Sequence, residues 1–257
     1  MPRPLRSALL AASLSLLAWE SPAAAGIVAA DDFDAPVNLL SRTGSPEFHS
    51  FRSSFQLFGV YGRDGEHDLG PDLFDDTSFG GSGGIIRSGK RDNVFAVQDP
   101  GRGGAFEATW EFDLGGQTLS EFAVELAAVG GFESTDRFRF AASVDGGPAV
   151  VLFETATALG EAVTYTYENG SAETEMSALE IGDRVLSNRF QTFSTDAVAG
   201  LSGDRLRLTF SGSTTGIGEV FALDNVRFNG GVAAVPEPGS WALMLLAAGG
   251  LAARRRR

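Results

Sequence analysis

Cysteine is absent from the 257-residue sequence, and tryptophan and tyrosine occur only three times each. Without cysteine there is no disulfide framework, no thiolate metal site and no cysteine nucleophile. Histidine is almost absent too: only His49 and His67 occur, and neither an H-E-x-x-H motif nor a histidine–cysteine spacing suggests a zinc site. The protein must therefore be stabilised by its hydrophobic core, with a bound metal ion as a further contribution.

Phenylalanine (20 residues) and glycine (33 residues) are abundant instead, which suits short strands joined by tight turns. In residues 104–116, GAFEATWEFDLGG, apolar side chains alternate with polar ones, so that Phe106 and Trp110 share one face of a strand. Similar segments are LSEFAVELAAV, DRFRFAASVDGG, AVVLFET, AVTYTYENG, RFQTFST, DRLRLTFSG and GEVFALDNVRFNG. Several short strands with turn residues between them predict an all-β fold, an antiparallel two-sheet sandwich of the jelly-roll kind.

Two segments interrupt this pattern. Residues 168–185, ENGSAETEMSALEIGDRV, have room for a turn of helix. Residues 53–92 are rich in glycine and aspartate with few apolar runs, which predicts long loops between edge strands. Asp145, Gly146 and Gly147 predict a tight turn.

The first 25 residues have the order of a secretory signal peptide. Arg3 and Arg6 precede an apolar run over residues 8–19, and Ala23-Ala24-Ala25 supplies small residues for cleavage. Cleavage after Ala25 fits best, and Ala30 is the second choice. The alternative is a buried helix of the mature fold.

The last residues, VPEPGSWALMLLAAGGLAARRRR, end in a short apolar segment and four arginines. Residues 240–253 carry no charge. As a helix they span about 21 Å at 1.5 Å per residue, less than the ~30 Å hydrocarbon core of a bilayer. Trp241 at one interface and arginines that extend to the cytoplasm compensate for this length. We therefore predict a short transmembrane helix with the body of the protein outside.

This tail resembles the PEP-CTERM sorting signal of Gram-negative bacteria. The resemblance rests on Pro236, Glu237 and Pro238, the apolar segment and the basic end, which consists of Arg254, Arg255, Arg256 and Arg257. It implies recognition by an exosortase, a membrane protease-transpeptidase that cuts near Pro-Glu-Pro, and transient residence in the inner membrane. It also implies export to the cell surface or the extracellular polysaccharide matrix, as in a biofilm. A plain C-terminal anchor is the alternative.

We therefore expect a signal peptide (residues 1–25), a β-sandwich domain (26–230), a linker (231–235) and the sorting signal (236–257). Removal of both ends takes away six arginines and two glutamates, which leaves 14 basic and 31 acidic residues and a net charge of −17. Such a surface repels nucleic acid and anionic lipid, so no nucleic-acid partner is expected.

The two ends of the body, AADDFDAP (residues 29–36) and FALDNVRF (residues 221–228), resemble the terminal strands of secreted jelly-roll, lectin-like and carbohydrate-binding domains and, more loosely, MAM-type domains. The resemblance implies that the terminal strands lie side by side and hold a structural calcium ion. The candidate ligands are Asp32, Asp34, Asp224 and Asn225, because calcium prefers six to eight oxygen ligands. Alternatively these residues cap turns and strand ends.

A second acidic stretch, RDGEHDLGPDLFDD (residues 63–76), lacks the glycine and glutamate positions of an EF-hand loop, which favours a solvated loop. GGSGG around Ser82 lacks the strand and helix of a nucleophile elbow. GIIRSGKR (residues 84–91) has Arg91 where a P-loop has serine or threonine.

Paired carboxylates are the remaining route to catalysis, because a glycosidase needs two acids roughly 5–10 Å apart. Glu107 with Glu111, and Glu121 with Glu125, each share a strand face, but four residues along a strand span about 13 Å. We therefore expect a non-enzymatic structural or adhesive sandwich that binds carbohydrate, with a secreted polysaccharide hydrolase as the alternative.

Overall fold

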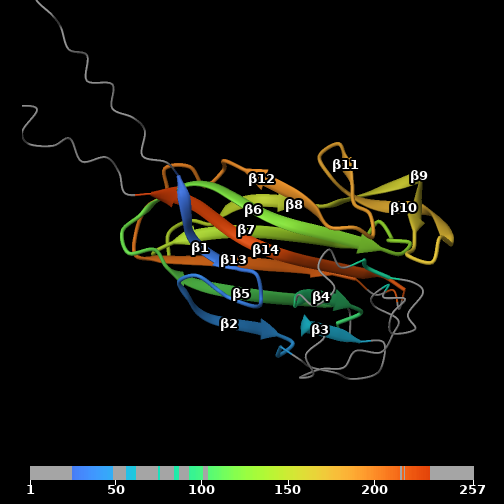
Figure 1. Cartoon of the computed structure of the whole chain (residues 1–257), viewed down its shortest axis with the longest axis horizontal. Helices are drawn as coiled ribbons and strands as arrows, with labels where there is room; N and C mark the ends of the chain where they lie inside the picture. The colour runs from blue at the N-terminus through green and yellow to red at the C-terminus, as the bar shows by residue number, and fades with distance from the viewer. Residues whose placement is uncertain are drawn as a thin grey trace, which may run out of the picture.

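The computed structural model describes residues 25–48, 56–61, 75, 84–86, 93–100, 104–214, 216 and 218–231. These residues form fourteen strands, coloured along the chain in Figure 1. The strands are β1 (Gly26–Asp31), β2 (Leu39–Ser45), β3 (Leu57–Tyr61), β4 (Val94–Gln98), β5 (Ala105–Asp113), β6 (Thr118–Val129), β7 (Arg137–Val144), β8 (Val150–Glu154), β9 (Ala156–Thr166), β10 (Ala172–Ile181), β11 (Arg184–Val185), β12 (Gln191–Thr195), β13 (Arg205–Ser213) and β14 (Val220–Gly231).

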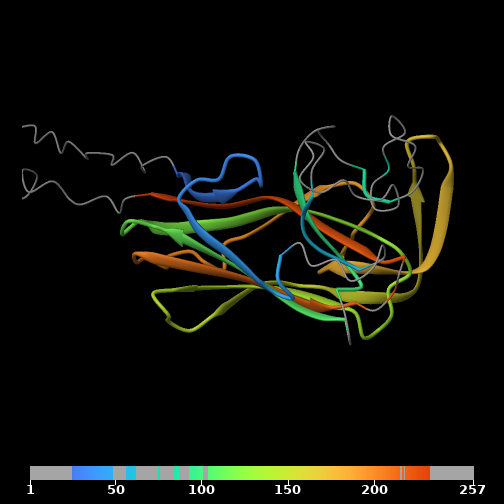
Figure 2. The same cartoon turned by 90° about the horizontal axis from the view of Figure 1, so that it is seen from below.

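Two antiparallel sheets stack face to face, as Figure 2 shows from the side. The six-stranded sheet has the order β12-β6-β14-β4-β3, and β1 pairs with β14 next to β4. The five-stranded sheet has the order β2-β5-β13-β7-β8. A small third sheet, β11-β10-β9, stands at one end of both views. The predicted all-β antiparallel sandwich is therefore confirmed.

The terminal strands lie side by side, as the resemblance implied. In the antiparallel ladder of β1 and β14, Gly26 is opposite Gly230 and Asp31 is opposite Val226. Both ends of the sandwich chain therefore emerge at the same end of the molecule (Figure 1). Within the described ranges no helix is long and apolar enough to cross a membrane. The apolar segment 240–253 and the signal segment 1–24 lie outside those ranges.

The expected turn of helix over residues 168–185 is wrong. Residues 172–181 form β10, which pairs with β9 from Ala172 opposite Thr166 to Glu180 opposite Ala156. Pairing within the β9–β10 hairpin here overrides a weak local preference for helix. The predicted loop over residues 53–92 is wrong for Leu57–Tyr61, which form β3 beside β4; most of that segment lies outside the described residues.

Phenylalanine rings fill the space between the two sheets. Phe138 stacks on Phe221 with ring centroids 4.2 Å apart, and Phe140 stacks on Phe210 at 4.5 Å. The inward alternation predicted for β5 holds, because Trp110 is fully buried. The polar residues that alternate with these side chains are left on the outer faces.

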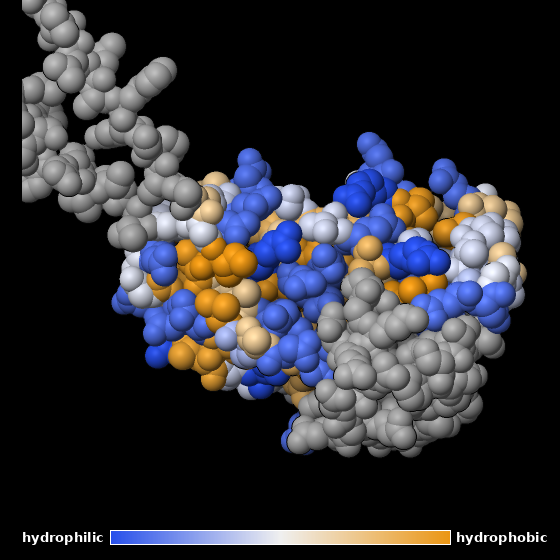
Figure 3. All heavy atoms as spheres, viewed as in Figure 1, coloured by the Kyte–Doolittle hydropathy of each residue, from blue (hydrophilic) through white to orange (hydrophobic). Residues whose placement is uncertain are grey.

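One end of the six-stranded sheet is buried on its outer face as well. Tyr165 and Tyr167 of the β9–β10 hairpin, together with Ile85, pack against small residues such as Ala127 and Ala222. This second core explains why all five residues of β4 are buried. Figure 3 shows hydrophilic residues across the middle of the viewed face and hydrophobic ones in groups toward its ends.

Truncation of one ring in the inter-sheet layer tests this core. Phe210 is fully buried and contacts aromatic rings of both sheets. We expect Phe210→Ala to lower the free energy of unfolding by about 3–5 kcal/mol, because it removes apolar contacts and leaves a cavity. Val151→Ala, at a side chain that is 41% exposed, is the control and should change it by less than about 0.5 kcal/mol. Urea unfolding measures both, and equal effects would contradict the assigned core.

Candidate functional site

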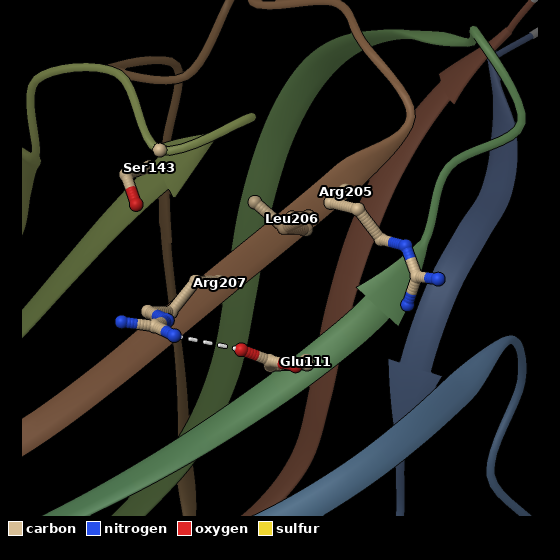
Figure 4. Close-up of a pocket in the computed structure, with 6 residues that line it drawn as sticks. Glu111, Ser143, Arg205, Leu206 and Arg207 are labelled. Carbon is tan, nitrogen blue, oxygen red and sulfur yellow. Dashed lines mark hydrogen bonds and ion pairs between the residues drawn. The ribbon is translucent and has the colours of Figure 1, made fainter.

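A hollow of about 270 Å³ lies on the outer face of the five-stranded sheet. It is lined by Glu111, Ser143, Gly146, Arg205, Leu206 and Arg207. Figure 4 shows that these residues come from the neighbouring strands β5, β13 and β7 and from the turn that follows β7. No single sequence motif could mark this place in advance, because its residues lie up to 96 positions apart and are brought together by strand pairing.

Strand register places the polar side chains of the hollow next to one another. Arg207 lies opposite Glu111 on one side and opposite Ser143 on the other. Its guanidinium Nη2 donates to Glu111 Oε1 at 2.8 Å (dashed in Figure 4). The two side chains are 60% and 38% exposed, so this ion pair contributes at most about 1 kcal/mol to stability. The pair orients two groups that remain open to a ligand.

The turn after β7 forms one wall of the hollow. Asp145 and Gly146 have φ angles of 51° and 70°, the left-handed conformation that the predicted turn requires. The Asp145 carboxylate accepts hydrogen bonds from the backbone nitrogens of Asp204 at 3.1 Å and Arg205 at 2.8 Å. These bonds hold the start of β13, and therefore Arg205, against the turn.

The hollow offers hydrogen-bond donors and acceptors and a single carboxylate, Glu111, which is already paired with Arg207. Neither predicted carboxylate pair converges here. Glu107 and Glu111 lie on the outer face of the five-stranded sheet, while Glu121 and Glu125 lie on the outer face of the other sheet. The lining therefore presents polar groups to a ligand, and the predicted glutamate pairs do not meet in it.

A second polar group lies at the end of the sandwich near the β9–β10 hairpin. Carboxylate oxygens of Glu133, Asp136 and Glu219 all lie within 4.8 Å of one another, and Asp136 and Glu219 are each only 3% exposed. Among the described residues this is the one group of three or more acids close enough to hold a metal ion together. No local spacing in the sequence marks this group, because the segments that precede β7 and β14 are more than 80 residues apart and meet only in the fold.

Backbone and hydroxyl groups hold this carboxylate cluster in place. Thr214 Oγ1 donates to Glu219 Oε2 at 2.5 Å, and the nitrogen of Gly216 donates to the same oxygen at 2.9 Å. The nitrogen of Glu133 donates to Asp136 Oδ2 at 2.6 Å. Three carboxylates with converging oxygens could hold a hard divalent cation such as calcium, or else share protons among themselves.

The proximity of the three acids shifts their protonation. Burial, followed by the influence of Glu133, raises the pKa of Asp136 from 3.8 to about 6. Burial likewise raises the pKa of Glu219 from 4.5 to about 7. Hydrogen bonding first to Glu219 and then to Asp136 lowers the pKa of Glu133. Protonation of Glu219 and Asp136 is therefore favoured relative to ordinary carboxyl groups.

The calcium ligands predicted from the chain ends are placed separately. Asp32 Oδ1 accepts hydrogen bonds from the nitrogens of Asp34 and Ala35, at 3.1 and 2.6 Å, as a turn cap does. Asp34 Oδ1 accepts from Asn93 Nδ2 at 2.7 Å. These contacts are the ones expected if Asp32 and Asp34 cap turns and strand ends. Calcium at these positions stays a prediction.

The other two predicted ligands lie at an irregularity in β14. Asn225 has a φ of 49° within the register shift between Asp224 and Arg227, which is a β-bulge. Its side-chain nitrogen donates to Glu125 Oε2 at 3.0 Å, and its backbone nitrogen donates to Asp224 Oδ1 at 2.6 Å. Calcium at Asp224 and Asn225 likewise stays a prediction.

Asp31, the neighbour of those predicted ligands, is the fully buried acid of the N-terminal motif. Arg42 binds it with two hydrogen bonds of 2.5 Å each, from Nε and Nη2, and the guanidinium also lies 5.4 Å from the ring centroid of Phe33. Since β1 and β2 belong to different sheets, this ion pair ties the two sheets together at one corner. The sequence does not distinguish Asp31 from Asp32 and Asp34, because nothing nearby marks Arg42 as its partner.

The remaining candidates from the sequence lie outside the described residues: His49, His67, Ser82, Arg91, most of the acidic stretch 63–76, and the sorting residues Pro236 to Pro238 and Arg254 to Arg257. Asp75 is the one described member of the acidic stretch, and it is buried, with a carboxylate oxygen that accepts a hydrogen bond from the nitrogen of Glu168. Asp75 is therefore part of the fold and departs from the expected solvated loop.

Comparison with known families supports the sequence reading of the tail. Residues 234–257 match the PEP-CTERM protein-sorting motif, so the PEP-CTERM identification made from Pro-Glu-Pro, the apolar segment and the arginines is confirmed. The match covers the sorting tail and leaves the sandwich unassigned. No curated protein matches the chain.

Three solved structures are among those similar to the chain. TmCBM61 in complex with β-1,4-galactotriose is 10% identical, with 68% of this chain and 88% of that one covered and a TM-score of 0.30. The K2 cleaved adhesin domain of Lys-gingipain is 14% identical (73% and 97% covered, TM-score 0.31). The mannan-recognising carbohydrate-binding module TmCBM27 is 16% identical (75% and 96% covered, TM-score 0.28). Overlap of this size is too slight to transfer a ligand to this chain.

The carboxylate cluster generates a prediction for stability against pH. A carboxyl group whose pKa is raised by folding stabilises the folded state below its unfolded pKa, and this contribution is lost as pH rises through the folded pKa. The melting temperature should therefore fall between pH 5 and pH 8, as Asp136 and Glu219 lose their protons. Glu133, whose pKa is lowered, contributes stability that is lost as pH falls below about 4.5. Glu219→Gln, which keeps a neutral side chain, should raise the melting temperature at pH 8 and flatten this dependence.

Scanning fluorimetry in EDTA measures this effect without interference from metal ions. Glu107→Gln, on an exposed position of β5, removes the same charge and is expected to leave the pH dependence unchanged. A melting temperature that rises between pH 5 and pH 8 only in the presence of the Glu219 carboxylate would show that the assigned protonation is wrong.

Proposed function

We propose that an exosortase processes this chain during export and that its β-sandwich binds polysaccharide, without cleaving it, at the cell surface or in the extracellular matrix. The match of residues 234–257 to the PEP-CTERM motif supports the first part of this proposal. The observation that carries the second part is the hollow on the five-stranded sheet, whose lining presents Arg205, Arg207, Glu111 and Ser143 to solvent.

The arrangement of the chain fits delivery of the sandwich by the tail. The first residue of β1 and the last residues of β14 lie side by side, so the signal segment and the sorting tail leave from one end of the sandwich. In this proposal the apolar segment 240–253 holds the chain in the inner membrane until cleavage near Pro236, Glu237 and Pro238. The body then carries its net charge of −17 outside the cell, which keeps it apart from nucleic acid and soluble.

Substitution of the Pro-Glu-Pro element tests the sorting step. Replacement of Pro236, Glu237 and Pro238 with alanine should cause the full-length chain to accumulate in the inner membrane, because the processing enzyme no longer recognises it. Ser240→Ala, next to the element, is the matched control and should be processed normally. Membrane fractionation with immunoblotting measures both, and unchanged processing of the triple variant would contradict exosortase sorting.

Retention on polysaccharide tests the role of the sandwich. The protein should bind matrix polysaccharide saturably and release it undegraded, and the same assay run with calcium and with EDTA shows whether a metal ion supports binding. A separate measurement tests for a structural calcium ion. If calcium is such an ion, millimolar calcium should raise the melting temperature. Loss of that shift in Asp34→Asn would locate the ion at the chain ends, and loss in Glu219→Gln would locate it at the carboxylate cluster.

The same assay separates binding from the hydrolase alternative. Hydrolysis requires two acids in reach of the polymer, and the closest group of acids in the described structure contains the buried Asp136 and Glu219. Release of shortened chains that Glu219→Gln abolishes would establish a hydrolase and overturn the proposal. Absence of both retention and cleavage would overturn polysaccharide binding altogether.

A further inference from the structure

Arginine is unevenly distributed over the described part of the chain. Eight arginines lie there: Arg42, Arg137, Arg139, Arg184, Arg189, Arg205, Arg207 and Arg227. Four of these, Arg137 and Arg139 on β7 and Arg205 and Arg207 on β13, are exposed on two neighbouring strands of the five-stranded sheet. We call this set the arginine face. Half of the described arginines therefore lie on two neighbouring strands of a body whose net charge is −17.

The strand register determines how the arginine face is laid out. Arg137 lies opposite Ser213 and Arg139 lies opposite Ser211, while Arg207 lies opposite Ser143. Two pairs of arginines therefore stand at opposite ends of a row that follows β13 for about 27 Å. Hydroxyl side chains occupy the middle of the row, with Thr209 between the two pairs. The hollow lies at one end of this row, so a chain-like ligand could contact the whole of it.

Most of these arginines are free to bind an external anion. Arg207 is ion-paired with Glu111. Arg137, Arg139 and Arg205 form no ion pair within 4.0 Å with any described residue. The other acids of this face are cross-strand neighbours of the two arginine strands: Glu154 on β8 lies opposite Arg139, and on β5 Asp113 lies opposite Arg205 and Glu107 opposite Ser211.

The acids of the opposite side are too far away to cancel this charge. Glu121 and Glu125 lie on the outer face of the six-stranded sheet, where they accept hydrogen bonds from Asn229 at 2.8 Å and Asn225 at 3.0 Å. Stacked sheets are about 10 Å apart, whereas charges in water are screened over about 8 Å at physiological salt. The field at the arginine face is therefore set by its four arginines together with the acids of the same face on β5 and β8.

We propose that the arginine face binds an acidic polysaccharide, one whose sugar units carry carboxylates. This inference rests on the proposed function and names the class of polymer. The planar guanidinium group donates two parallel hydrogen bonds to a carboxylate, and the intervening serine and threonine hydroxyls can bond to sugar hydroxyls. Two pairs of arginines at the ends of the row can bind carboxylates that recur along an extended chain, and Arg207 either leaves Glu111 for the ligand or binds both.

The test compares one polymer with and without its charge. Immobilised full-length protein, kept in mild detergent and EDTA, is titrated with polygalacturonate and with the same polymer after full methyl esterification. We expect binding of the acid form only, and we expect it to weaken by at least about tenfold when sodium chloride is raised from about 50 mM to about 300 mM.

Substitutions then locate the binding. Arg137→Gln with Arg139→Gln should weaken polygalacturonate binding at least about tenfold. Arg227→Gln with Arg184→Gln removes the same charge from outside the arginine face, and it should leave the affinity within about twofold. Melting temperatures of both double variants confirm that they fold.

The outcomes separate this inference from the proposed function. Equal binding of the acid and esterified polymers would overturn the arginine face as an acid-specific site while polysaccharide binding stands. Equal losses in the two double variants would also overturn it, since net charge and not location would then govern binding. If neither polymer binds, the arginine-face inference is also overturned. Retention on a neutral matrix glucan in the same experiment would then show that the proposed polysaccharide binding still stands, and lack of retention would show that it fails as well.

Discussion

The layer of phenylalanine rings between the two sheets is the constraint on which the rest of this structure depends. A chain without cysteine has no covalent link to hold two sheets together, so burial of apolar side chains must do so. Stacked and tilted ring pairs such as Phe138–Phe221 and Phe122–Phe140 connect the five-stranded sheet to the six-stranded one. Because every second residue of β5, β7 and β13 points into that layer, the residues between them are left to face solvent, and these carry the arginines.

Polar contacts close the margins of the sandwich, where aromatic packing ends. The buried pair of Asp31 and Arg42 joins β1 to β2 at one corner. The carboxylate cluster of Glu133, Asp136 and Glu219 closes the far end, where hydroxyl and backbone donors hold it. These two groups differ in kind: the first is a salt bridge between unlike charges, and the second concentrates like charges that must bind protons or a cation. The far end is therefore the part of the fold most sensitive to pH.

Sequence patterns predicted the parts of this protein that depend on local order. Alternation of phenylalanine with polar residues predicted β5, β7 and the sandwich, and the order of Pro236, Glu237, Pro238, the apolar segment and the arginines predicted the sorting tail. Residues 172–181 were misjudged, because pairing with β9 decides their conformation. Asp32 and Asp34 were predicted as site residues, whereas the buried acid is Asp31. Burial of an acid depends on a partner such as Arg42, which sequence spacing does not reveal.

The proposed binding surface could not be predicted for the same reason. Strand register alone places Arg137 and Arg139 beside Ser213 and Ser211, and Arg207 beside Glu111. Each of these arginines, taken singly in the sequence, is an ordinary exposed residue of an alternating strand. The arginines form one surface only because β7 and β13 are neighbours in the sheet. The acidic residues of β6 and β14 lie on the opposite side of the molecule.

Footprinting of arginine side chains in the presence of polysaccharide tests this account most directly. The protein would be labelled with phenylglyoxal, which reacts with exposed guanidinium groups, with and without saturating polygalacturonate, and each site would be quantified by mass spectrometry. The account predicts protection of Arg137, Arg139 and Arg205, with unchanged labelling of Arg184 and Arg227. Protection of Arg227 with none on β7 and β13 would place the ligand on the other sheet and contradict the account.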